Sequence, residues 1–149
     1  MAGFEEFDNP NAERFPEFTA ALRADMLAEV TALLDDVFRG ERPLTDLLAG
    51  DETYVTPALA AHYGLPIPPP AGRRADGLAL TPLPPGRGGL ATTGLFLTIT
   101  SQPLRTSPVQ RGVWVLEDLL GRRLPTPPAD VEELSEAAAR AAGETIRAQ

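Results

Sequence analysis

Glu29 stands where the sequence predicts an apolar position. It lies beside Met26 on the apolar stripe of a helix predicted within residues 16–39. A buried carboxylate is costly unless it is paired, so Glu29 needs a partner or a raised pKa. A carboxyl group with a raised pKa is typical of a catalytic acid or base. We favour the alternative from the sequence, a structural ion pair with Arg105 or Arg111.

His62 is the only histidine of the chain, and there is no cysteine. One histidine provides no recognisable zinc ligand set, and no Ser/His/Asp arrangement can be identified from residue spacing. We predict that His62, near the end of a short helix, is satisfied by backbone carbonyl groups. The glycine-rich "GRGG" at 86–89 lacks the Lys and Ser/Thr that follow in a P-loop, so it predicts a turn.

The only tryptophan lies in "RTSPVQRGVWVLEDLLG", residues 105–121. On a helical wheel Trp114 lies about 140° from Val109, which begins the apolar stripe of this segment. Trp114 shares its face with Arg111 and Asp118. Such a face suits docking to a neighbouring domain, with Trp and Arg as anchors. We favour the alternative in which Trp114 packs against a proline-containing segment or residues 87–100, because large aromatic residues are usually buried.

Helical patterns and proline clusters predict the fold class. The expected helices cover 16–39, 43–50, 57–64, 89–98, 108–120 and 129–149. Weak alternation predicts short extended pieces at 53–55 and 76–83. Most of the 16 prolines lie between residues 66 and 128, where they favour extended connections. We therefore predict a mainly α, small irregular helical domain with Pro-rich connections and at most a minor two-stranded sheet.

Length and charge exclude several classes of protein. With 149 residues the chain fits about one domain in size. The net charge of −8 argues against non-specific binding to nucleic acid, since phosphates would be repelled. No apolar run is long enough for a membrane span, and the first residues do not resemble a secretory signal.

Three stretches carry a resemblance to two known families. "FPEFTAALRADMLAEV" and "LLAGDETYVTPALAAHYGLP" resemble the C-terminal part of domain-of-unknown-function family 1592. "RGGLATTGLFLTITSQPLRTSPVQRGVWVLEDLLGRRLPTPPADVEEL" resembles family 1588. Both families are typical of planctomycete-type, cytochrome-like, multidomain secreted proteins. The resemblance divides the chain into residues 1–64 and 65–149, which we expect to pack together as one unit.

The resemblance implies a setting more than a reaction. It implies a non-catalytic structural or interaction module next to a c-type haem domain, in a periplasmic or extracellular electron-transfer or oxidoreductase protein. No cofactor is expected in this chain, while haem c is expected in the parent protein, whose haem-bearing domain is the expected partner. In such proteins a Cys-x-x-Cys-His motif follows a segment like "ETIRAQ", so the chain is expected to be a fragment.

Two other functions remain open at this stage. A polysaccharide-binding module would use exposed Trp114, Tyr54 and Tyr63 as its aromatic platform. A hydrolase would need Glu29 and His62 to share one cleft. Neither family supplies catalytic residues to carry over, so the candidate residues are those of an interaction or structural network: Glu29, His62, Arg105, Arg111, Trp114 and Asp118.

Overall fold

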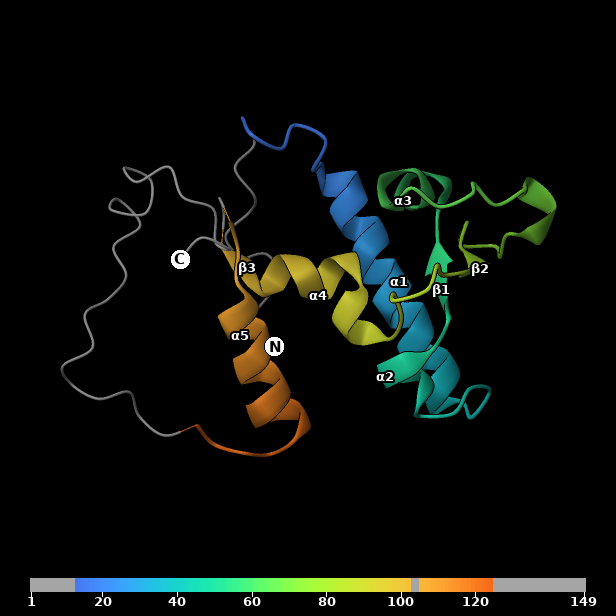
Figure 1. Ribbon diagram of the computed structural model, residues 1–149. Coiled ribbons are helices and arrows are strands. Elements are labelled where there is room, and N and C mark those ends of the chain that lie inside the picture. Colours follow the sequence, from blue (N-terminus) through green and yellow to red (C-terminus); the bar gives the residue numbers. More distant parts are fainter. Residues whose placement is uncertain (1–12, 103–104, 125–149) are drawn as a thin grey trace. The chain divides into compact units, whose positions relative to one another are not determined.

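The computed structural model describes residues 13–102 and 105–124 (Figure 1). The chain divides into two compact units, Met1–Gly112 and Val113–Gln149. The described residues are mainly α-helical, which confirms the predicted fold class. The helix predicted for 129–149 lies outside them.

The longest helix, α1 (Ala20–Phe38), confirms the strongest helical pattern of the sequence. The Thr19 hydroxyl caps its first turn by accepting a hydrogen bond from the backbone N–H of Leu22 (3.2 Å). Gly40, with φ of +78°, turns the chain away after the last helical residue. One face of α1 is buried, by the side chains of Leu22, Met26, Glu29, Ala32, Leu33 and Asp36.

A two-stranded antiparallel sheet lies beside α1 (Figure 1). It pairs β1 (Glu52–Val55) with β2 (Ala79–Pro82), so that Thr53 is opposite Thr81. The short helix α2 (Asp46–Ala49) precedes β1. Three residues of β1 are buried, because α1 covers the strand.

Helix α3 (Pro57–Tyr63) begins and ends as its sequence predicts. The Thr56 hydroxyl accepts a hydrogen bond from the N–H of Leu59, and Pro57 occupies the first turn, where no N–H partner is needed. Gly64 ends the helix in the left-handed conformation, with φ of +68°. A 3₁₀ turn, Pro70–Gly72, follows in the Pro-rich connection to β2.

The segment predicted as one helix at 89–98 forms two pieces. A 3₁₀ turn, Leu90–Thr92, precedes α4 (Gly94–Ile99). Thr93 interrupts the helix in an extended conformation, and its hydroxyl caps α4 by accepting from the N–H of Phe96. The chain divides here because threonine caps a helix better than it continues one.

Beyond α4 a second, two-residue strand pair joins β3 (Ser101–Gln102) to β4 (Arg105–Thr106), which the sequence did not predict. Helix α5 (Pro108–Trp114) then continues as a π-helical segment, Val115–Leu119. Gly121, with φ of +62°, follows the predicted end of this segment. No helix in the described ranges is long and apolar enough to cross a membrane.

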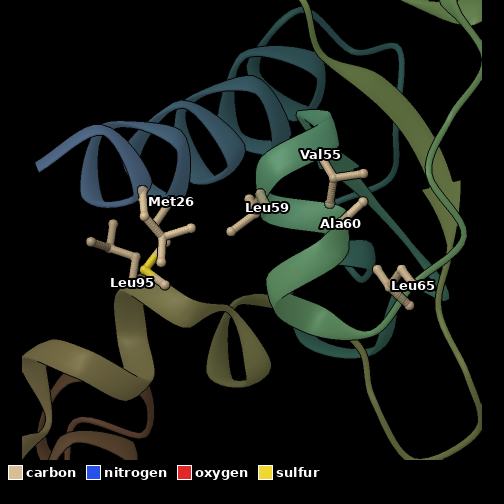
Figure 2. Packing of buried hydrophobic residues seen from close by; sticks show 7 residues of the cluster. Met26, Val55, Leu59, Ala60, Leu65 and Leu95 are labelled. Atoms are coloured by element: carbon tan, nitrogen blue, oxygen red, sulfur yellow. The ribbon is translucent and has the colours of Figure 1, made fainter. Parts of the chain in front are cut away.

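The main hydrophobic core joins α1, β1, α3 and α4. Figure 2 shows Met26 of α1 against Leu95 of α4, with Leu59 of α3 close by. Val55, Leu59 and Ala60 are fully buried. Burial of a side chain the size of leucine stabilises a fold by about 1.5–3 kcal/mol, so these contacts hold the four elements together. The remaining members of this core are Leu22 and Leu65.

Candidate functional site

The Glu29 carboxyl group is the most enclosed polar group described, with 1% of the residue exposed. Its position on the core face of α1 directs it toward β1 and α3. The Thr53 hydroxyl of β1 donates to Oε1 (2.6 Å), and the Tyr63 hydroxyl of α3 donates to Oε2 (2.6 Å). Both carboxyl oxygens therefore have a protein partner although the residue is almost completely buried.

Tyr63 extends the cluster to α4 and to the loop before it. Its hydroxyl oxygen accepts a hydrogen bond from the backbone N–H of Gly94 (2.6 Å). The guanidinium carbon of Arg87 lies 4.6 Å from the centroid of the tyrosine ring, a cation–π distance. Arg87 Nη1 also donates to the Tyr63 carbonyl oxygen (3.4 Å). Tyr63 thus links Glu29 to Arg87 and Gly94, which follow Tyr63 by 24 and 31 positions in the sequence.

Burial dominates the electrostatics of this cluster. It raises the pKa of the Glu29 carboxyl above the ordinary value of 4.5, because the charged form loses its hydration. The hydrogen bonds from Thr53 and Tyr63 and the positive charge of Arg87 act in the opposite direction. Burial and the neighbouring Glu29 raise the pKa of Tyr63, so its hydroxyl stays protonated and able to donate.

A cavity of about 10 Å³ lies next to the carboxyl group. That volume suits about one water molecule, far less than a substrate needs. The lining residues are Glu29, Leu33, Glu52, Thr53, Leu83, Arg87, Gly89, Thr92 and Thr93. His62 does not line this cavity, so the geometry does not support the hydrolase hypothesis, which required Glu29 and His62 in one cleft.

The sequence correctly indicated that Glu29 is buried, whereas its predicted ion pair with Arg105 or Arg111 stays a prediction. The described partners of its carboxyl oxygens are the hydroxyl groups of Thr53 and Tyr63. Arg111 donates from Nε to the Thr100 hydroxyl and from Nη2 to the Ser101 hydroxyl, both at 3.2 Å. It therefore connects α5 to the end of α4. The side chain of Arg105 lies outside the described part of the structure.

The remaining candidate residues are His62, Trp114 and Asp118. His62 is exposed on the last turn of α3, with its ring centroid 5.9 Å from that of Tyr63. Trp114 is half-buried and Asp118 is exposed, and both belong to the second compact unit. The predicted contact of Trp114 with a proline segment or residues 87–100 stays a prediction.

A second polar cluster, which sequence reasoning missed, surrounds Tyr54. The Tyr54 hydroxyl donates to Asp36 of α1, and the Arg74 guanidinium lies 5.1 Å from the tyrosine ring centroid. Arg74 also approaches Asp36 and Asp76, at 3.8 and 3.4 Å. Desolvation and the hydrogen bond to Asp36 raise the pKa of Tyr54. Asp36 sits one helical turn beyond Ala32 on α1, a spacing that marks it as a second polar residue on the buried face.

These two clusters bear on the polysaccharide hypothesis. Tyr54 is 8% exposed, and the Tyr63 hydroxyl is bonded to Glu29 and Gly94. Glycan binding needs exposed aromatic faces, whereas Tyr54 is buried and Tyr63 is partly buried, with Arg87 over its ring. The structure therefore removes most of the predicted aromatic platform.

Metal binding and covalent haem attachment each require particular side chains. Within residues 13–102 and 105–124 there is no group of three His, Cys, Asp or Glu side chains that could hold a metal ion. Covalent attachment of a c-type haem uses two cysteine thiols, and the sequence has no cysteine.

Comparisons with known proteins match the two halves of the chain separately. Residues 2–65 match the family PSD4, a protein of unknown function (DUF1592), and residues 87–149 match the family PSCyt3, a protein of unknown function (DUF1588). Both resemblances are confirmed. The family names hint at cytochrome-associated domains of unknown function. No curated protein and no solved structure matches the chain.

The matched PSD4 and PSCyt3 segments share the main core. Leu95, from the PSCyt3 segment, packs with Met26 and Leu59 of the PSD4 segment. Gly89 approaches α2 so closely that an added Cβ would lie 2.5 Å from the Leu48 carbonyl oxygen. Its φ of +64° also favours glycine. The Glu29 cluster lies at this junction, with Arg87 and Gly94 on one side and Glu29, Thr53 and Tyr63 on the other.

Proposed function

We propose that the chain is a non-catalytic structural module that supports an adjacent c-type haem domain in an extracytoplasmic electron-transfer or oxidoreductase protein. The observation that carries this proposal is the match to PSD4 and PSCyt3, whose names hint at an association with cytochromes. In this proposal the haem belongs to the neighbouring domain of the parent protein.

The chemistry of the described polar residues supports a structural role. The Glu29 carboxyl group, which has the perturbed pKa expected of an acid–base residue, is hydrogen-bonded on both oxygens and shielded from solvent. A catalytic acid needs a substrate within hydrogen-bond reach, and a cavity the size of one water does not admit one. The cluster instead joins α1, β1, α3 and α4.

Spectroscopy and the parent gene test this proposal together. The purified chain should show no Soret band after haem is added and excess haem is removed, since it has no cysteine for attachment. The parent gene should encode a Cys-x-x-Cys-His motif within a few dozen codons after Gln149. A gene without such a motif near this region would contradict the proposal.

Binding to the haem domain tests the supporting role directly. The haem-bearing part of the parent protein, expressed separately, should bind the purified chain in isothermal titration calorimetry and melt at a higher temperature when bound. If the haem-bearing part melted at the same temperature with and without a saturating concentration of the purified chain, a stabilising role would be contradicted. Bovine serum albumin at the same concentration controls for non-specific effects.

A further inference from the structure

Arg87 and Glu29 both interact with Tyr63, but they form no direct ion pair with each other. The guanidinium group lies over the tyrosine ring, while the tyrosine hydroxyl donates to the carboxyl group. No direct ion pair joins Arg87 to Glu29, both of which lie in the described part of the chain. The two charged groups nevertheless line the same cavity of about 10 Å³.

The size and lining of this cavity suit one water molecule. A buried water needs about 10–15 Å³ and two to four polar partners. Each Glu29 oxygen accepts one described hydrogen bond and has a further lone pair to offer. Arg87 has N–H groups beyond the one directed at the Tyr63 carbonyl. The residues that line the cavity therefore include both an acceptor, Glu29, and a donor, Arg87.

We propose that one buried water in this cavity bridges the Glu29 carboxyl group and the Arg87 guanidinium, and that this bridged pair fastens the PSCyt3 segment to the PSD4 segment. A bridging water is nearly as favourable in enthalpy as a direct hydrogen bond. The bridge gives the buried acid a cationic partner while the guanidinium keeps its contact with the Tyr63 ring. This inference does not depend on the proposed function.

The other titratable groups around Glu29 are already engaged. Glu52 of β1 also lines the cavity, but its carboxylate accepts from Arg42 at 3.4 Å. Tyr63 of α3 donates its proton to Glu29 and accepts from Gly94. The residues from the 3₁₀ turn before α4 and its cap, Thr92 and Thr93, are uncharged. Arg87 accordingly lowers the pKa of Glu29 while burial raises it.

The bridged pair of Glu29 and Arg87 is tested in the full chain by following the NMR chemical shift of the Glu29 side-chain carboxyl carbon as the pH is changed. In Arg87→Gln the titration midpoint should move to higher pH, because the buried carboxylate loses its cationic partner. Arg73→Gln is the matched control, since Arg73 also donates to a backbone carbonyl, that of Pro68, and does not line the cavity. An unchanged midpoint in Arg87→Gln, or an equal shift in Arg73→Gln, would overturn the proposal.

A second measurement keeps the test decisive if Arg87→Gln does not fold. A high-resolution crystal structure of the unsubstituted chain should contain one ordered water within hydrogen-bond distance of both a Glu29 oxygen and an Arg87 nitrogen. A dry cavity, or a direct Glu29–Arg87 contact, would refute the water bridge.

Discussion

Glu29 accepts hydrogen bonds from two neutral hydroxyl groups, and these partners determine what each substitution costs. Breaking a buried ion pair leaves an uncompensated charge and costs about 3–5 kcal/mol. Removing a carboxyl group that accepts from two hydroxyls leaves two neutral donors. Each donor that stays buried without a partner destabilises the fold by about 1–3 kcal/mol. Loss of the carboxyl group from the hydroxyl partners Thr53 and Tyr63 therefore carries a different penalty from loss of one member of an ion pair.

Glu29→Gln should flatten the pH dependence of stability. Because burial raises the folded-state pKa of Glu29 above 4.5, its stabilising contribution is fully present below pH 4.5 and is lost as the pH rises through that raised value. Glutamine does not ionise, and it can keep both contacts by accepting from Tyr63 and donating to Thr53 Oγ1. At neutral pH the variant should be at least as stable as the unsubstituted chain.

Urea unfolding between about pH 4 and pH 8 measures the free energy of unfolding of Glu29→Gln and of the unsubstituted chain at each pH. Glu41→Gln, at an exposed position, is the control and should leave the pH profile unchanged. Parallel stability curves for Glu29→Gln and the unsubstituted chain would show that Glu29 does not carry the pH dependence.

The burial of Glu29 could be predicted from the sequence because it depends on the spacing of residues within one helix. Its partners could not, because Thr53 and Tyr63 follow it by 24 and 34 positions. Nothing local in "TYV" or "LAAHYG" indicates a hydroxyl directed at α1. Arg87 belongs to the predicted glycine-rich turn, and its place beside Tyr63 depends on the tertiary fold.

At the scale of elements, local signals predicted helix ends better than helix continuity. Helix α3, capped by Thr56 and ended by Gly64, follows its predicted range 57–64 closely, since capping depends on one or two residues. Helix α1, capped by Thr19, begins after the predicted residue 16. The break at Thr93 was missed because the apolar spacing of 89–98 suits a helix throughout. The strand at 79–82 was indicated, but its pairing with β1 depends on a long connection.

Gly94→Ala should weaken the contact between α1, α3 and α4. A Cβ at this position would lie 2.5 Å from the Tyr63 hydroxyl oxygen and 2.9 Å from the Met26 methyl carbon. The tyrosine is held by its two hydrogen bonds, so it cannot move without losing one. Overpacking of this kind costs about 1–3 kcal/mol, measured as a loss in the free energy of unfolding.

Gly112→Ala provides the matched helical control for this substitution. A Cβ at Gly112 of α5 meets no atom within 4 Å, and alanine favours a helix by about 1 kcal/mol over glycine. Chemical denaturation should show Gly112→Ala to be neutral or stabilising. If both alanine variants were equally stable, the close packing at Gly94 would not matter to the fold.

At the scale of the whole molecule, the two matched families do not coincide with the two compact units. The first unit, Met1–Gly112, contains the PSD4 segment, the Pro-rich connection and the first part of the PSCyt3 segment. Leu95 completes the core and Tyr63 bonds to Gly94, so the fold of the PSD4 segment depends on residues that follow it. The connection contributes β2, which pairs with β1.

Removal of the PSCyt3 segment tests this account most directly. Residues 1–86 retain α1, α3 and the β1–β2 pair but lack Arg87, Gly94 and Leu95. They should show reduced helical circular dichroism and no cooperative urea transition, whereas the full chain should unfold cooperatively. A cooperative transition in residues 1–86, with a midpoint equal to that of the full chain, would contradict the claim that the two family segments form one core.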